Sequence, residues 1–244
     1  MKRLLVVSAH AADFVWRAGG LIARFTAEGG QARVVALSYG ERGESGELWK
    51  EPGQTVERVK AIRHREASQA AVALAASFEC LDLGDYPLRP GPAALERLVA
   101  IIVETAPDLL VTHTPQDPFN PDHPEAYTLT EKARQLATGA GVASAFRTVR
   151  PPEFWLFEPH QPELCAFVPN VFVDITPVWP QKQQAMAAMA AQAYLQQYYA
   201  ERAAHRANHA RRIRGHKGIE RAEAFQRVLP QVVHDLKALF GGEA

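Results

Sequence analysis

The sequence predicts a doubly wound α/β fold, in which a mostly parallel sheet carries helices on both faces. Through the first two-thirds of the 244 residues, short apolar runs of strand length alternate with longer amphipathic stretches. The short runs are apolar at successive positions, which is typical of strands buried on both faces. Strands that alternate with helices in this way are usually parallel neighbours joined by crossover helices.

Each element of this fold follows from its own run of residues. The predicted strands in the first part of the chain cover residues 3–8, 32–38, 78–83 and 108–113. The predicted helices between them cover residues 16–28, 55–76, 92–105 and 124–138. Gly29 and Gly30 end the first of these helices, and Pro92 lies near the first turn of the third.

The last third of the chain is predicted to be mainly helical. Two further strands are expected at residues 154–158 and 171–175, and helices at residues 181–210 and 219–240. The sequence contains no internal repeat and no hinge-like linker. We therefore expect a single domain over residues 1–244, with a helical C-terminal extension from about residue 180.

Composition excludes several classes of function. The chain has 27 Lys and Arg residues against 27 Asp and Glu residues, so it lacks the positive surplus that nucleic acids and anionic membranes attract. The apolar run at residues 4–9 is too short for a signal-peptide core, and no run reaches the ~20 residues that cross a bilayer. We expect a cytoplasmic protein that binds neither nucleic acid nor membrane.

Polar side chains gather where the predicted strands end. His10 and Asp13 follow the first strand, and Asp122 and His123 follow the fourth. In a doubly wound fold the ligand site lies beyond the carboxyl ends of the strands, so these residues are expected to meet. Two imidazoles and a carboxylate suit a metal site with three protein ligands and open positions for water or substrate.

The same segments resemble the PIG-L / LmbE-like family of metal-dependent de-N-acetylases, which have a Rossmann-like fold. Residues 6–13 (VVSAHAAD) resemble its strand followed by A-H-P-D-D-E, and residues 121–123 (PDH) resemble its H-P-D-H. Residues 63–66 (RHRE) and 173–176 (VDIT), followed by Lys182, match further family segments. The resemblance implies that His10, Asp13 and His123 hold the metal. Zn²⁺ suits these ligands, and so do Fe²⁺ and Co²⁺.

The departures from the family pattern are as informative as the matches. Ala12 occupies the position of the first aspartate of A-H-P-D-D-E, which in the deacetylases is the general base that takes a proton from the attacking water. Asn120 replaces the first histidine of H-P-D-H. One interpretation is a homologue that has lost its activity. The other is a family member that catalyses a different reaction with the same metal ligands.

Further segments are similar to a hydratase branch of this family. They are residues 8–20 (SAHAADFVWRAGG), 37–55, 117–124 (DPFNPDHP) and 156–165 (LFEPHQPELC). The resemblance implies a lyase that adds water to a carbon–carbon double bond of a tricarboxylate, in bacterial gallate and protocatechuate degradation. The expected partner is this small-molecule tricarboxylate, and the family also suggests a homo-oligomer.

Hydration requires an acid and a base beside the metal, and two residues outside the family motifs are the candidates. Glu47 lies in the glycine-punctuated loop at residues 40–50, where Trp49 could bury its carboxyl group and raise its pKa. Glu44 is the second choice in this loop. His160 stands between Pro159 and Pro162, which restrict the backbone around it. We predict Glu47 and His160 as the acid/base pair, with the two roles open and a surface histidine as the alternative for His160.

The remaining assignments concern the substrate and the support of the metal. Arg63, which matches a substrate contact of the family, and Arg42 and Arg17 are predicted to bind carboxylates, with surface salt bridges as the alternative. Asp122 is predicted to orient His123 from behind. Two other functions stay open: a zinc-dependent N-acetyl-sugar de-N-acetylase that uses Glu47 as a substitute base, and a non-catalytic metal-binding protein.

Overall fold

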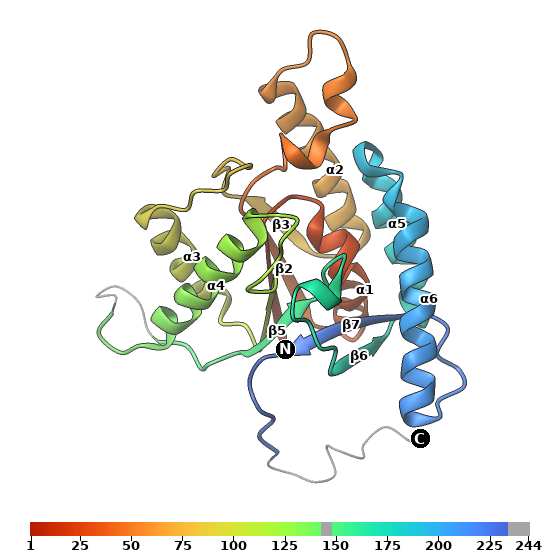
Figure 1. The fold of residues 1–244 in the computed structure, drawn as a ribbon. Helices are drawn as coiled ribbons and strands as arrows, with labels where there is room; N and C mark the ends of the chain where they lie inside the picture. The colour runs from red at the N-terminus through yellow and green to blue at the C-terminus, as the bar shows by residue number, and fades with distance from the viewer. Residues whose placement is uncertain (143–147, 234–244) are drawn as a thin grey trace.

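A single mixed sheet forms the centre of the molecule (Figure 1). The computed structural model describes residues 1–142 and 148–233. Within them, the seven strands have the order β3-β2-β1-β4-β5-β7-β6. Their bounds are β1 Arg3–Ser8, β2 Gln31–Ala36, β3 Ser77–Cys80, β4 Leu109–Thr112, β5 Glu153–Phe157, β6 Val171–Asp174 and β7 Ala222–Arg227. The strands from β3 to β5 are parallel, and β7 is antiparallel to both β5 and β6, so the sheet is mostly parallel as predicted.

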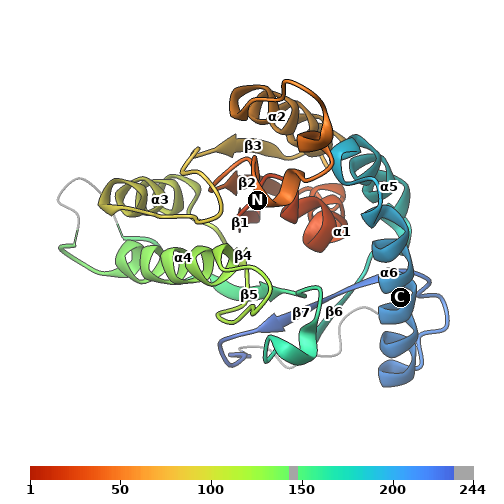
Figure 2. The same cartoon turned by 45° about the horizontal axis from the view of Figure 1, so that its top comes forward.

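Helices cover both faces of the sheet, as the apolar strands require (Figure 2). On β1, Leu4 and Val6 pack in the cluster that includes α1 (Asp13–Ala27), α2 (Val56–Ala73) and α5 (Trp179–Ala188). Leu5 and Val7 point to the other face, where α3 (Pro92–Thr105) and α4 (Asp122–Thr138) lie. The central strand is thus buried on both sides, which explains its continuous apolar run.

The C-terminal part of the chain differs from the prediction. The helix expected at residues 219–240 is wrong: residues 222–227 form β7, and residues 234–240 lie outside the described part of the chain. Ala, Glu and Gln favour helices in isolation. Here a tertiary contact overrides that preference, because Glu223 is buried against Lys182 and accepts the backbone N–H groups of Gly20 and Leu21.

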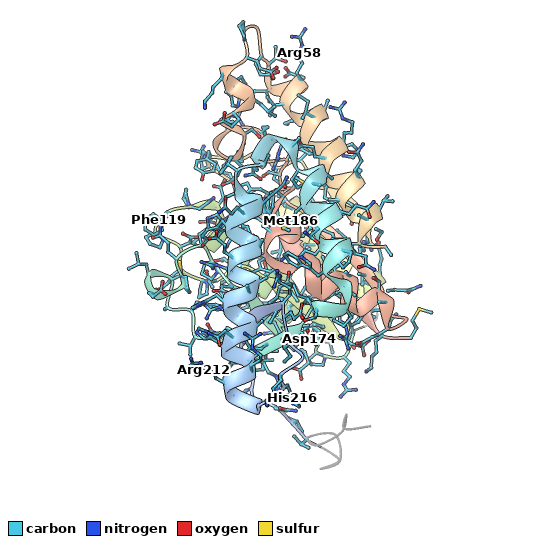
Figure 3. The ribbon with its side chains drawn as sticks, turned by 90° about the vertical axis from the view of Figure 1, so that its right-hand side faces the viewer. Arg58, Phe119, Asp174, Met186, Arg212 and His216 are labelled. Carbon is cyan, nitrogen blue, oxygen red and sulfur yellow. The ribbon has the colours of Figure 1, made fainter. Side chains whose placement is uncertain are left out.

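The long helix predicted at residues 181–210 is interrupted near its middle. It is divided into α5 and α6 (Leu195–Arg214), with a short 3₁₀ turn at Ala190–Gln192 between them. Met189 has a non-helical backbone, with φ −86° and ψ 61°. Figure 3 looks onto this side of the molecule and shows α6 running down its front. The interruption turns Gln192 toward the loops that follow the parallel strands.

The sheet order creates a switch point between β1 and β4. The chain proceeds from β1 to β2 and β3 on one side, and from β4 to β5 on the other. Loops that leave the carboxyl ends of β1 and β4 therefore diverge and leave room for a site, as the strand order predicts. In Figure 1 the segment between β2 and α2 projects at the top of the molecule. Among the described residues, no helix combines the length and apolar character needed to cross a membrane.

Candidate active site

His10 and His123 are oriented as metal ligands usually are. The Nε2 atom of His10 lies 3.1 Å from Asp122 Oδ2, and the Nδ1 atom of His123 lies 2.7 Å from Asp117 Oδ2. The other ring nitrogens, Nδ1 of His10 and Nε2 of His123, are buried and have no hydrogen-bond partner. A carboxylate behind each imidazole, with the opposite nitrogen left free, is the usual support of a metal-binding histidine.

Asp13 lies between the two free nitrogens. Its Oδ2 atom is 3.3 Å from His10 Nδ1, and its Oδ1 atom is 3.7 Å from His123 Nε2. Two groups of three residues each bring potential ligand atoms within 4.8 Å of one another. One group is His10, Glu44 and His123, and the other is Asp13, His113 and His123. The residues present therefore fit a divalent metal, and the structure brings the three predicted ligands together.

His113 also belongs to the cluster, although no role is predicted for it from the sequence. It is the last residue of the predicted fourth strand. Its Nε2 atom accepts the backbone N–H of Ala9 at 2.9 Å, and its ring stacks on His123 with centroids 4.1 Å apart. An imidazole nitrogen that accepts a hydrogen bond has its lone pair occupied. His113 therefore supports the ring of His123 and the end of β1, and its Nε2 atom is not free to bind a metal.

Asp122 supports a different ligand from the one predicted. It contacts His10 rather than His123, and it accepts the backbone N–H groups of Tyr86 and Leu88 at 2.9 and 2.8 Å. Adjacent residues at the start of a helix point in different directions, so Asp122 cannot easily face the ring of His123. Asp117, a residue with no predicted role, supports His123 instead.

The charges around the cluster shift the pKa values of His10 and His123 in opposite directions. Burial disfavours protonation of His10, but the neighbouring carboxylates of Asp122, Asp13 and Glu44 prevail and raise its pKa to about 10. Burial, His113 and Arg17 hold the pKa of His123 well below its usual range. In the metal-free protein His123 is thus neutral and ready to bind a metal, while His10 must first release a proton.

The loop after β2 brings Glu44 rather than Glu47 to this cluster. Glu44 accepts hydrogen bonds from Asn120 Nδ2 at 2.8 Å and from Gln192 Nε2 at 3.0 Å. Gly40 permits this approach, because its φ is +68° and a Cβ atom there would lie 3.0 Å from Glu44 Cβ. Glu47 lies outside the cluster, with 55 % of its side chain exposed and a hydrogen bond from Lys50 Nζ.

His160 follows β5 and is held in place through its backbone. The carbonyl oxygens of Pro159 and His160 accept hydrogen bonds from Arg202, and the His160 carbonyl also accepts from Tyr198. Part of His160 remains exposed, and its ring lies 5.3 Å and 5.5 Å from the rings of Tyr198 and Tyr199. Burial of the ring, together with the positive charges of Arg17 and Arg202, lowers its pKa to about 3. His160 is therefore neutral and accessible at pH 7.

We expect the Arg202→Gln substitution to raise the pKa of His160, because it removes one of the cations that oppose the imidazolium. The measurement is an NMR titration of the His160 ring in both proteins. In the wild-type protein the folded-state pKa of His160 is below the ordinary value of 6.5. The stability that the neutral His160 ring contributes is therefore lost as pH falls below 6.5. Arg212→Gln, at an exposed position near the end of α6 (Figure 3), is the control and should leave the titration unchanged.

The predicted carboxylate-binding arginines have different surroundings. Arg63 is fully buried and donates to Glu66, Gln192 and the Tyr39 carbonyl, so it has no surface with which to meet a substrate. The structure therefore contradicts its assignment to the substrate. Arg42 has a half-exposed side chain that faces Glu41 and Asp85. Arg17 is buried 3.4 Å from Asp13, and its Nε atom has no hydrogen-bond partner, so it is the arginine nearest the metal ligands.

Comparison with known proteins identifies two groups of relatives. Residues 5–134 match the family model PIG-L, described as GlcNAc-PI de-N-acetylase. The chain is 44 % identical over 238 residues to 4-oxalmesaconate hydratase of Pseudomonas putida, covering 96 % of this chain and 92 % of that protein. It is 29 % identical over 176 residues to 1D-myo-inositol 2-acetamido-2-deoxy-alpha-D-glucopyranoside deacetylase of Rhodococcus erythropolis, covering 63 % of this chain and 60 % of that protein.

Solved structures show the same two groups of relatives. The crystal structure of the 4-carboxy-2-hydroxymuconate hydratase from Pseudomonas putida matches with a TM-score of 0.93 at 44 % identity, covering 96 % of this chain and 99 % of that one. N,N'-diacetylchitobiose deacetylase from Pyrococcus horikoshii matches with a TM-score of 0.77 at 19 % identity, covering 93 % and 84 %. The second match shows the shared fold alone.

Proposed function

Because this chain belongs to the PIG-L family, we propose that its metal centre serves a hydratase reaction. The proposed substrate is 4-oxalomesaconate, also named 4-carboxy-2-hydroxymuconate. The proposed product is 4-carboxy-4-hydroxy-2-oxoadipate, formed in gallate or protocatechuate degradation. The similarity to the Pseudomonas putida hydratase along 96 % of the chain supports this choice over deacetylation.

The proposal rests on the carboxylate beside the metal ligands, which is supplied by Glu44 here and by the residue at position 12 in the deacetylases. Position 12, where the deacetylases have their base, is a buried alanine with 2 % of its surface exposed. Glu44 instead brings a carboxylate oxygen within 4.8 Å of ring nitrogens of His10 and His123. The cluster therefore retains a potential base, but the base approaches from the loop after β2 rather than from the residue that precedes α1.

Hydration adds a hydroxyl group to one carbon and a proton to its neighbour, so a group must take a proton from water and a group must return one. Glu44 is suited to take it, because both of its oxygens already accept amide N–H groups and the ionised form is the better acceptor. The proton that Glu44 takes can be returned to the neighbouring carbon, while His160, which is neutral and exposed, is suited to donate a hydrogen bond from its ring N–H to the substrate. We therefore assign the proton transfer to Glu44 and a hydrogen bond to the substrate to His160.

His10, Asp13 and His123 would hold the metal, which when bound would polarise the oxo-acid end of the substrate and stabilise negative charge. Zn²⁺ is the proposed ion, and Fe²⁺ or Co²⁺ would use the same donors. Arg17 and the half-exposed Arg42 are proposed to attract the substrate carboxylates from their places in the cluster and the loop. The proposal also includes the homo-oligomer and the cytoplasmic location expected from the sequence.

The test follows the absorbance of the conjugated tricarboxylate when the metal-loaded protein is added. We expect the chromophore to disappear, and chelation followed by metal readdition to abolish and restore this activity. A parallel assay measures acetate released from an N-acetylglucosaminide. Acetate release with an unchanged chromophore would establish the deacetylase instead. Metal binding with neither activity would indicate a non-catalytic role.

The Ala12→Asp substitution should impair hydration. It places a second carboxylate beside the metal ligands, where it would repel an anionic substrate and compete with Glu44 for the proton. The expected result is a rise in KM together with a fall in kcat, measured in the absorbance assay. Ala12→Ser, which adds a small neutral group at the same position, is the control for crowding. An unchanged rate in Ala12→Asp would show that position 12 does not face the substrate.

A further inference from the structure

Gln192 is buried between the loop after β2 and the helices that cover the sheet, and only 1 % of its surface is exposed. Its Oε1 atom accepts hydrogen bonds from Trp16 Nε1 and from Arg63 Nη2, each at 3.1 Å. Its Nε2 atom donates to Glu44 Oε2 at 3.0 Å. The side chain thus joins α1, α2 and the loop after β2 at one point.

The orientation of the Gln192 amide is determined by its partners. The Trp16 indole and the Arg63 guanidinium can only donate hydrogen bonds, so both must face the amide oxygen. The amide nitrogen is then the only end that can meet Glu44. Because a flipped amide would place its N–H groups against two donors, Gln192 can present only a donor to the carboxylate.

The residues that bind the Gln192 amide are themselves held by hydrogen bonds. Arg63 donates to Glu66 Oε2 at 2.8 Å, and Glu66 Oε1 accepts the backbone N–H of Ala191 at 2.8 Å. The connection therefore closes into a ring that runs from α2 through Glu66 to the 190–192 turn, through Gln192 and back to Arg63. All of these side chains are buried, so the ring is shielded from competition with water.

We propose that Gln192 is a positioning residue of the hydration reaction, which holds the Glu44 carboxylate toward the metal ligands through its amide N–H. This inference rests on the hydratase function proposed above. Asn120 holds the other oxygen of Glu44, and its amide is oriented in the same way because its Oδ1 atom accepts the N–H of Asp122. Gln192 connects the base to the helical layer, whereas Asn120 connects it to the metal loop.

The test compares Gln192→Met, which removes both functions of the amide, with Gln192→Glu, which keeps an acceptor for Trp16 and Arg63 but puts a carboxylate against Glu44. Loss of a hydrogen bond to a charged group should lower kcat about 10- to 100-fold in both variants. KM should stay close to the wild-type value, because Gln192 is too buried to touch the substrate. Gln197→Met, an exposed position on α6, is the matched control.

A double variant separates positioning from a general structural role. If Gln192 acts through Glu44, Gln192→Glu combined with Glu44→Ala should be no slower than Glu44→Ala alone. Losses that multiply in the double variant, or a wild-type kcat in Gln192→Glu, would overturn the inference. A wild-type protein that does not hydrate the substrate would instead overturn the proposed function, and with it the role of Gln192.

Discussion

Replacing Glu44 with Gln should lower kcat for hydration about 10²- to 10⁴-fold, the contribution typical of a general base. The substitution keeps the size of the side chain but removes the group that takes a proton. It also places an amide where Asn120 and Gln192 both donate, so the new side chain cannot satisfy both donors. We expect this to be the largest effect of any substitution outside the metal ligands.

Glu47→Gln is the matched comparison, because it makes the same change three residues further along the same loop. Glu47 is exposed and paired with Lys50, and exposed ion pairs contribute little to stability. The kcat of the Glu47→Gln variant should therefore stay within about twofold of wild type. Metal content must be measured in both variants, since Glu44 lies close to His10 and His123. A large loss in Glu47→Gln with full activity in Glu44→Gln would restore the assignment made from the sequence.

The loop after β2 shows a limit of prediction from the sequence, because Glu47 was predicted and the structure brings Glu44 to the metal ligands instead. The loop was selected for its glycines, charges and place after a strand, and the structure brings one of its carboxylates close to His10 and His123. The choice within it rested on burial against Trp49, but the Trp49 indole donates to the Glu41 carbonyl and 38 % of Trp49 is exposed. Residues 43–45 and 48–50 form separate 3₁₀ turns, so the two carboxylates point to different surroundings. Such turns have no periodic pattern that a sequence could reveal.

The parallel strands were predictable because they are short, apolar and separated by amphipathic helices. β7 was not, because the residues that form it favour a helix and become a strand only by pairing with β5 and β6. The same reasoning applies to Gln192. Its partners Trp16, Arg63 and Glu44 are between 129 and 176 residues away in the chain, so only the folded structure reveals the connection.

The three metal ligands were predicted from the family resemblance. The structure adds His113 as a competing ligand, and substitutions can test which residues hold the metal. His123→Ala should abolish metal binding and lower activity about 10³-fold, because it removes a donor and with it several kcal/mol of electrostatic stabilisation. Asp117→Asn should weaken metal affinity about 10- to 100-fold, since it leaves His123 in place without its supporting carboxylate. Metal content is measured by elemental analysis after dialysis.

His113→Gln decides whether the metal is held by the proposed ligands His10, Asp13 and His123 or by the competing set of Asp13, His113 and His123. A glutamine oxygen can still accept the N–H of Ala9, so the end of β1 should stay in place, and about one metal ion per chain should remain bound. His10→Gln, in contrast, should lose the ion, because the free Nδ1 atom of His10 faces Asp13 while His113 Nε2 is already engaged. Loss of the metal in His113→Gln with retention in His10→Gln would place the ion between Asp13, His113 and His123 instead.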